Sequence, residues 1–392
     1  MSDHTPDDAP PPAVGESTPT PVPGHGDWSP VQQLRVHEPG ELIAAMPALV
    51  GFTPERSLVV VLLRRPQPSN PNSVIGPVIR FDLDQNRRRQ RGLAAALASA
   101  VARICASETA TEVLAVIIDD RMREPRTRGG ATPWGTLVAA FGRQLARKEV
   151  TLAGAWAVSA IEAGQRWWSL LDTDHQGTLS DPTTSMVSFA YVLNGRPIHS
   201  TRSELTNLVT PDRDSTQEVT AHLEDALSAV HARYVAATRA SDPESYYRRA
   251  LEQVLYQIAA LDSGDLPTAG QIAELAVVLR DRRVRDALLA LAVGEHATAA
   301  EQLWVTLVRS LSGRDRAEAA VLLGYSAYVR GDGPLAGIAL DAALETDPSH
   351  SMAILLDTAL RSGMRPQELR RLADHGLGIA AELGIDLGPI HR

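Results

Sequence analysis

The sequence predicts an α/β domain, with a mixed or mainly parallel sheet flanked by helices, followed by an all-α domain with tetratricopeptide-like packing. Two observations carry this prediction. Short valine-rich apolar runs alternate with amphipathic helical patterns up to about residue 212, which is the pattern of a sheet covered by helices. After Pro211 the strand patterns stop and one helical pattern follows another. The 392 residues are enough for two separate cores.

The N-terminal segment 1–30 is predicted to be a disordered tail. It holds eight of the 26 prolines, with Gly, Ser, Thr and Asp between them. Such a segment cannot bury enough apolar surface to offset the entropy of ordering. The stretch APPPAV would suit a partner's proline-binding groove. A solvated spacer is the simpler interpretation.

The α/β domain is predicted to span residues 31–212. Pro39 suits the first turn of a helix, and Gly51 ends that helix. The stretch LVGFTPERSLVVVLLR continues through turn residues into a strand whose unbroken apolar run indicates burial on both faces. Glu55 and Arg56 are the best candidates in this stretch to face a ligand. The strands are predicted at 58–63, 74–84, 112–119, 151–159 and, as a possible edge strand, 166–171. The helices are predicted at 39–49, 87–106, 134–148, 183–193 and 203–209.

The helical domain is predicted to span residues 213–392. Its first helices are expected at 217–239, 243–261, 269–279 and 283–292, with three or more beyond them. Asp242 is the expected cap of the second helix, since Pro243 suits its first turn.

Composition excludes several classes of protein. A net charge of −9 disfavours a general nucleic-acid binder, because phosphate contacts need a basic field. No run approaches the 18 apolar residues of a membrane span, and the N-terminus lacks the basic start of a signal peptide. The single cysteine, Cys105, cannot form an internal disulfide, and a helical core position suits it. A cytoplasmic location is expected.

Four residues form the candidate catalytic set. Arg80 and Asp82 share one face of a predicted strand, where they would orient a carboxylate or phosphate; an ordinary ion pair is the alternative. Asp119 and Asp120 end another strand, a position that suits Mg²⁺; capping and turn formation are the alternative. The chain contains no GxxxxGK[ST], GxGxxG after a strand, GxSxG or HExxH motif. No cofactor and no metal are therefore predicted.

Three further features have a functional and a structural interpretation. His175 and His199 lie in loops where they would be able to meet, or are scattered surface histidines. The basic run NRRRQR, residues 86–91, would pair with nearby aspartates or meet an anionic partner. Trp167 and Trp168 would cover a sheet face or bind a partner.

Residues 317–350 resemble one tetratricopeptide repeat of 34 residues. The matching positions are Leu323, Gly324, Gly331, Ala336, Leu340, Ala343 and Pro348. The large aromatic that usually starts the first helix is Ala320 here, and the flanking copies are partial. The resemblance implies a helical stack with a concave groove of the kind that holds peptides. A compact bundle without a ligand is the alternative.

A wider resemblance runs from Leu34 to about Arg371. It rests on LRVHEPGELIAAMPALVGFTPERSLVVVLL, GPVIRFDL, VLAVIID, NGRPIHSTRSEL, RDALLAL and AYVRGDGPLAGIALDAALETDPSHSMAILL. These stretches are similar to the actinobacterial domain-of-unknown-function family 4192. Many members carry a Cys-Cys-Pro segment after the tryptophan-rich strand, and RWWSLLDTDHQGTLSDP has no cysteine. The resemblance implies that this chain shares the family's fold, cellular compartment and actinobacterial lineage. It leaves the function open.

The sequence thus favours a non-enzymatic protein that binds a protein or peptide through its helical groove. The alternative is a hydrolase or phosphate-handling enzyme at the carboxyl edge of the sheet, using Arg80, Asp82, Asp119 and Asp120. No nucleic acid and no membrane are expected as partners. The oligomeric state is left open.

Overall fold

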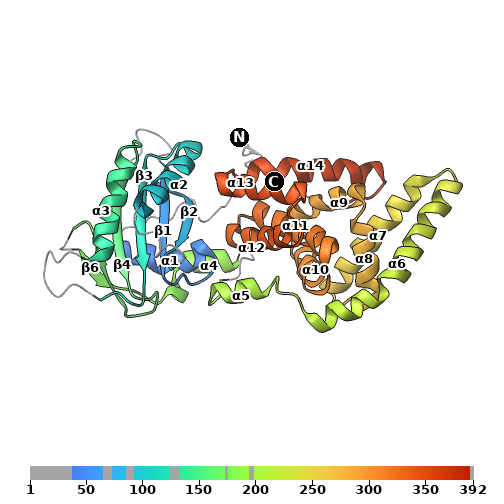
Figure 1. The fold of residues 1–392 in the computed structure, drawn as a ribbon, viewed down its shortest axis with the longest axis horizontal. Helices are drawn as coiled ribbons and strands as arrows, with labels where there is room; N and C mark the ends of the chain where they lie inside the picture. Colours follow the sequence, from blue (N-terminus) through green and yellow to red (C-terminus); the bar gives the residue numbers. More distant parts are fainter. Residues whose placement is uncertain are drawn as a thin grey trace, which may run out of the picture.

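The computed structural model describes residues 38–64, 73–84, 92–123, 132–172, 175–193 and 198–388. Figure 1 shows a sheet with its covering helices at one end of the molecule and a body made of helices at the other. This arrangement confirms the predicted fold class of an α/β half followed by an all-α half. None of the described helices combines the length and apolar character needed to cross a membrane.

The sheet has six strands in the order β2-β1-β3-β4-β5-β6. They are β1 (Ser57–Arg64), β2 (Val74–Asp82), β3 (Glu112–Ile118), β4 (Thr151–Val158), β5 (Arg166–Ser169) and β6 (Gln176–Thr178). Only β3 and β4 are parallel, so the sheet is mixed. The predicted edge strand, β5, does pair with β4, but β6 lies outside it. The sequence did not predict β6 because three residues, Gln-Gly-Thr, carry no apolar alternation.

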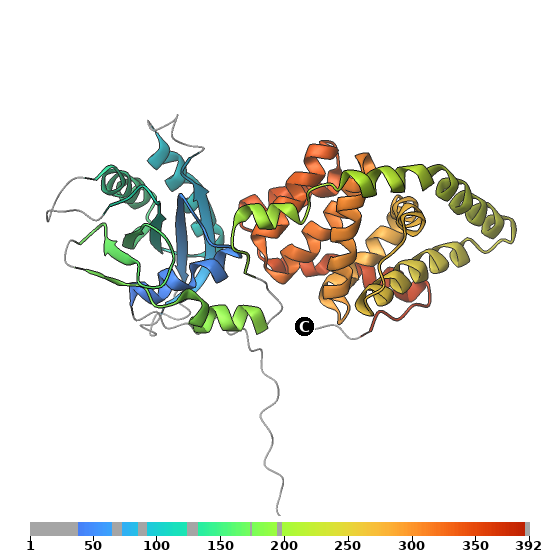
Figure 2. The same ribbon diagram turned by 90° about the horizontal axis from the view of Figure 1, so that it is seen from below.

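Helices cover both faces of this sheet (Figure 2). The helices are α1 (Pro39–Val50), α2 (Leu93–Glu108), α3 (Pro133–Ala146), the 3-10 helix η3 (Pro182–Thr184) and α4 (Met186–Leu193). Val59 and Val61 belong to the core that contains α1, whereas Leu58, Val60 and Leu62 belong to the core of α2 and α3. Successive side chains of a strand point to opposite faces, so burial on both faces explains the unbroken apolar run in β1. Gly51 has φ +83°, which ends α1 as predicted.

The remaining helices build the second half of the chain. They are α5 (Arg202–Asn207), α6 (Arg213–Arg239), α7 (Pro243–Asp262), α8 (Ala269–Leu279), α9 (Arg282–Leu288), the 3-10 helix η4 (Leu289–Val293), α10 (Ala297–Ser310), α11 (Gly313–Arg330), α12 (Gly333–Thr346), α13 (Ser351–Ser362) and α14 (Pro366–Glu382). Asp242 caps α7 as predicted, because its side chain accepts a hydrogen bond from the Ser245 N–H at 3.1 Å.

The segment that resembles a tetratricopeptide repeat forms the helix pair α11–α12. Gly331 has φ +84° at the turn between them. A Cβ atom on Gly324 would lie 2.9 Å from Leu340 of α12, so the small residue permits the close approach of the two helices. Every residue from Ala317 to Val329 is buried. A helix buried all round is central to its domain, so α11 presents no open concave face to a peptide.

Candidate functional site

The topology of the sheet brings the predicted aspartates to one edge. Strands β2 and β3 both run antiparallel to β1, so Ser57 at the start of β1 pairs with Asp82 on one side and with Ile118 on the other. Asp119 and Asp120 follow Ile118 directly. The carboxyl ends of β2 and β3 therefore meet at the same edge, where open α/β sheets commonly bind ligands.

Arginines engage the two aspartates that follow β3. Arg121 donates from Nε and Nη2 to the two oxygens of Asp119, at 2.6 Å each, and from Nη1 to Asp84 at 2.7 Å. Arg56 donates from Nε and Nη2 to Asp120 at 2.8 and 2.9 Å, and from Nη1 to Asp84 at 3.4 Å. Paired parallel N–H bonds of this kind are the strongest arginine–carboxylate geometry. The five side chains form one arginine–aspartate chain, in the order Asp120, Arg56, Asp84, Arg121 and Asp119.

This arginine–aspartate chain favours the ionised form of Asp84 and of Asp120. Hydrogen bonds from Arg121 hold the pKa of Asp84 below its ordinary value, and hydrogen bonds from Arg56 do the same for Asp120. The same bonds raise the pKa of both arginines. Three aspartates and two arginines carry a formal net charge of −1, and the Asp119 side chain is fully buried. Each of the three carboxylates therefore accepts at least one hydrogen bond from a guanidinium, although one negative charge is left over.

Arg80 and Asp82 form a separate pair. Arg80 Nη2 lies 3.4 Å from Asp82 Oδ2, and Arg80 Nε donates to the Ser57 hydroxyl at 2.7 Å. The guanidinium also lies 5.4 Å from the centre of the Phe52 ring. Burial lowers the pKa of Arg80, with Asp82 opposing that effect. The predicted four residues thus share an edge of the sheet, but they do not converge on one ion.

The Ser57 hydroxyl and the Cys105 thiol are hydrogen-bonded or buried. No three histidine, cysteine, aspartate or glutamate side chains of the described ranges are placed to hold a metal ion. The Ser57 hydroxyl donates to the Glu55 carbonyl oxygen and accepts from Arg80, so its proton points to a backbone oxygen. Cys105 is buried, and burial raises the pKa of its thiol to about 11. The thiol is a core group, as predicted.

The other sequence candidates also have structural partners. His175 pairs with Asp172 at 2.9 Å, and His199 lies 3.8 Å from Glu204. Trp167 and Trp168 are both buried, one in each of the two cores beside the sheet, which is the predicted covering role. The basic run 86–91 lies outside the described residues. The sequence missed Arg121 as the partner of Asp119, although the two are close neighbours in the chain.

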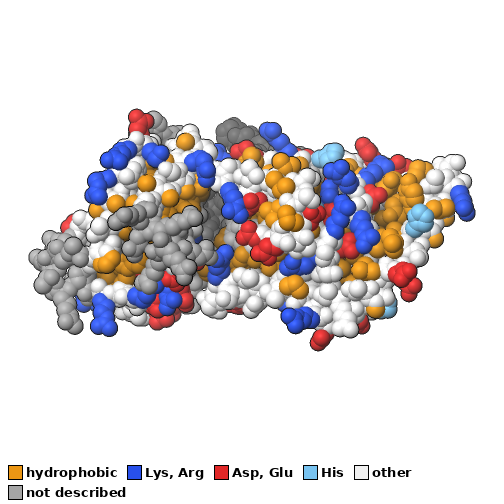
Figure 3. All heavy atoms as spheres, viewed as in Figure 1, with side chains coloured by type: hydrophobic (Ala, Val, Ile, Leu, Met, Phe, Trp, Pro, Cys, Tyr) orange, Lys and Arg blue, Asp and Glu red, His pale blue; other side chains and the backbone are white. Residues whose placement is uncertain are grey.

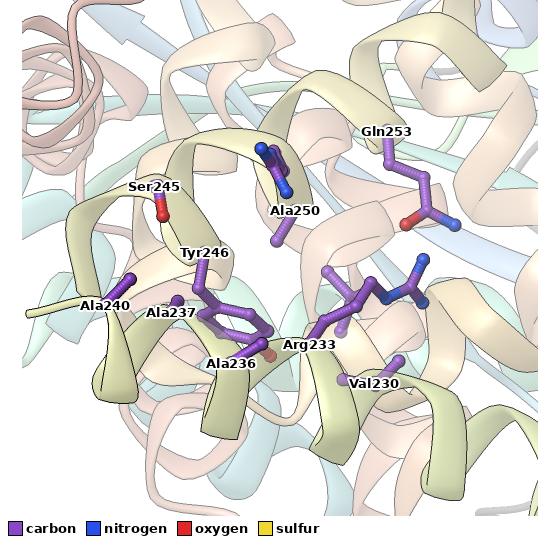
Figure 4. Close-up of a pocket in the computed structure, with 11 residues that line it drawn as sticks. Val230, Arg233, Ala236, Ala237, Ala240, Ser245, Tyr246, Ala250 and Gln253 are labelled. Atoms are coloured by element: carbon purple, nitrogen blue, oxygen red, sulfur yellow. The ribbon is translucent and has the colours of Figure 1, made fainter. Parts of the chain in front are cut away.

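A second candidate site lies in the helical half, between α6 and α7. A cavity of about 330 Å³ opens there, and four alanines give it room: Ala236, Ala237, Ala240 and Ala250. Figure 4 shows the Tyr246 ring lying over α6 and the Arg233 side chain reaching from α6 toward Gln253 of α7. Arg249 also lines the cavity and has no ion-pair partner within the part of the chain that the structure describes.

One tyrosine, Tyr246, lines this α6–α7 cavity and packs against two further tyrosines. Tyr246 stacks edge to face on Tyr234 and on Tyr247, with ring centres 5.3 Å apart in both pairs. Tyr234 is 41% exposed, and Tyr256, one turn beyond Gln253, is 67% exposed. Figure 3 shows hydrophobic side chains gathered at the end of the molecule that α6 and α7 form. Tyrosine and arginine are the residue types enriched at the centres of protein interfaces.

The protein belongs to the class in which an α/β part, here with a mixed six-stranded sheet, is followed by an all-helical part. The family model for a domain of unknown function (DUF4192) matches residues 39–367, from α1 to the start of α14. The chain belongs to this family, so that part of the sequence resemblance is confirmed. The search of curated proteins and the search of solved structures each gave no match.

Proposed function

We propose that the protein is a non-enzymatic binding protein that holds a protein or peptide partner on its helical half. The observation that carries this proposal is the α6–α7 cavity, with Tyr246 and Arg249 on its wall, Tyr234 packed on the Tyr246 ring, and the exposed Tyr256 one turn beyond Gln253 on α7. The repeat-like pair α11–α12 gives an open groove less support, because residues 317–329 of α11 are buried. The proposal therefore assigns the binding face to α6 and α7.

The charges of the cavity favour an acidic side chain on the partner. Arg233 donates to Glu274 at 3.0 Å, and Gln253 donates to the same carboxylate oxygen at 2.7 Å. Burial opposes ionisation of Glu274, but these hydrogen bonds lower its pKa below the ordinary value. Glu274 thus pairs with Arg233, whereas Arg249 on the cavity wall has no carboxylate partner among the residues that the structure describes. An acidic residue of the partner would pair with Arg249 while an apolar neighbour fills the space beside the alanines.

The enzyme alternative has less support. A hydrolase or phosphate-handling site at the sheet edge needs a carboxylate free to take a proton or a metal ion. Asp119 and Asp120 are each held by two hydrogen bonds from an arginine, and Asp82 pairs with Arg80. The edge therefore favours charge neutralisation over catalysis.

Affinity capture from the native cell tests the proposal. The full-length chain with Arg249→Glu and Tyr256→Ala is compared with the wild type and with a control that carries Arg371→Glu and Leu355→Ala. The control makes the same charge change and a similar loss of exposed apolar surface, on α14 and α13. All four side chains are exposed, so we expect each change to alter the free energy of unfolding by no more than about 0.5 kcal/mol.

Wild type and control are expected to retain the same partner, and the α7 variant is expected to lose it. The retained partner is then purified and titrated against each variant. Equal binding by the α7 variant and the control would remove the α6–α7 cavity as the binding face.

A further inference from the structure

A large cavity lies beside the arginine–aspartate chain, on the face of the sheet that α2 and α3 cover. Its volume is about 1030 Å³, at the upper end of the range for small-molecule sites. The first turns of α2 and α3 form two of its sides. Asp119, Arg121 and Met122, which follow β3, and Trp168 of β5 complete the wall.

The positive ends of two helices point to this cavity. Each helix precedes the strand to which it returns, α2 before β3 and α3 before β4, so both begin at the carboxyl edge of the sheet. Leu93, Ala94 and Ala95 of the first turn of α2 line the cavity, and Gly92 before them has no side chain to cap their N–H groups. The first N–H groups of a helix have no acceptor within it and attract anions.

Two arginines on the wall of this cavity offer further N–H donors. Arg121 places three of its five N–H bonds on Asp119 and Asp84, which leaves two donors. Arg123 is exposed on the cavity wall and makes no ion pair with any described residue. The arginine–aspartate chain that holds Arg121 carries a formal charge of −1, and Arg123 brings the sum beside the cavity to zero, so the N–H donors of the two arginines, rather than a net charge, favour an anion here.

The rest of the wall is aromatic and apolar. Trp134 and Trp168 line it, together with Leu83, Leu93 and Leu137. Trp168 is 7% exposed, and its indole Nε1–H is buried without a hydrogen-bond partner among the described residues. Buried donors of this kind are normally satisfied, so an unpaired one on a cavity wall needs an acceptor. This donor is an observation independent of the helix ends.

We propose that this cavity binds a small organic anion that carries both a phosphate and a planar ring, and that nucleoside monophosphates are the class it fits. The phosphate lies at the first turn of α2, within reach of Arg121 and Arg123. The ring packs between the tryptophans and the leucines, and one of its acceptor atoms takes the Trp168 N–H. This site is separate from the partner-binding face on α6 and α7.

Titration of the full-length protein tests the site. Adenosine monophosphate, guanosine monophosphate, adenosine and inorganic phosphate are each added while heat and tryptophan fluorescence are measured. We expect at least one of the two nucleotides to bind about tenfold or more tightly than either adenosine or phosphate, because only a nucleotide engages both the charged and the aromatic wall. Failure of both nucleotides to bind, or equal binding by inorganic phosphate, overturns the proposal.

Matched variants locate the bound nucleotide. Arg123→Gln is expected to weaken binding about tenfold or more, the loss typical of a charged hydrogen bond. Arg103→Gln removes the same charge from an exposed position of α2 outside the cavity lining, and it should leave affinity unchanged. Trp168→Phe keeps an aromatic ring but removes the N–H, and it should also weaken binding. Equal losses in the Arg103 and Arg123 variants would contradict the site.

Discussion

Arg365 Nε lies 3.2 Å from Oε1 of Glu108, and this contact joins the last helix of the helical half to the end of α2 beside the sheet. Arg64 at the end of β1 approaches the other oxygen of Glu108, also at 3.2 Å. The Glu108 side chain is only 2% exposed, whereas both arginines keep more than a third of their side chains in solvent. Glu108 is therefore the buried centre of a contact between the two halves.

Glu108→Gln should loosen this contact. The amide cannot pair with two guanidinium groups, so we expect the free energy of unfolding to fall by about 1–2 kcal/mol; the exposure of both arginines limits the loss. Urea unfolding measures the change, with Glu162→Gln at an exposed position as control. If both variants unfold at the wild-type urea concentration, the contact between the halves contributes nothing.

The arginine–aspartate chain predicts a loss of stability in acid. Hydrogen bonds lower the pKa of Asp84 and Asp120 in the folded protein below the ordinary aspartate value of 3.8. The unfolded chain then binds protons first as pH falls. The stabilisation is complete well above pH 3.8 and is lost progressively below it. Wild type should therefore lose more stability between about pH 5 and about pH 2.5 than a variant with Asp84→Asn and Asp120→Asn. Parallel pH profiles would contradict this role.

Two glycines of α14 should respond in opposite ways to alanine. A Cβ atom on Gly376 would lie 2.7 Å from the Asp286 carbonyl oxygen and 2.9 Å from that of Ala287. These are backbone atoms, so Gly376→Ala should cost about 1–3 kcal/mol of stability. Gly378 has nothing within 4 Å of the same position, so Gly378→Ala should gain up to about 1 kcal/mol from helix propensity. Thermal unfolding compares the two, and an equal effect would mean that α14 does not pack closely on α9.

Cys105 should be inert while the protein is folded. Its side chain is 1% exposed, and burial raises the pKa of the thiol to about 11. Only the thiolate reacts readily, so at pH 8 a thiol-specific disulfide reagent should modify Cys105 slowly. Modification should become fast in urea, where α2 is unfolded. Fast reaction of the folded chain would show that the core between α2 and the sheet opens readily.

Much of the fold was predictable because local patterns and burial agree. The helix start at Asp242 and Pro243 is a matter of adjacent residues, and the structure confirms it. The apolar run at β1 also signalled its own burial on both faces. Strand β6 was missed because a short polar strand carries no apolar run. The sequence also did not indicate that α11, in the repeat-like segment, is buried by other helices. Enclosure depends on helices far away in the sequence, which no local pattern records.

For the candidate residues, too, some properties follow from the local sequence and others from the tertiary structure. The sequence by itself determined that Asp119 and Asp120 end a strand, that Cys105 suits a core, and that the chain belongs to its family. Only the tertiary structure decided that Arg56 binds Asp120, 64 positions away, so that the carboxylates of the predicted catalytic set are neutralised. Local patterns follow from the backbone geometry of neighbouring residues. Ion pairs and cavities depend on which ends of distant strands and helices lie side by side. That arrangement is fixed only when the sheet forms.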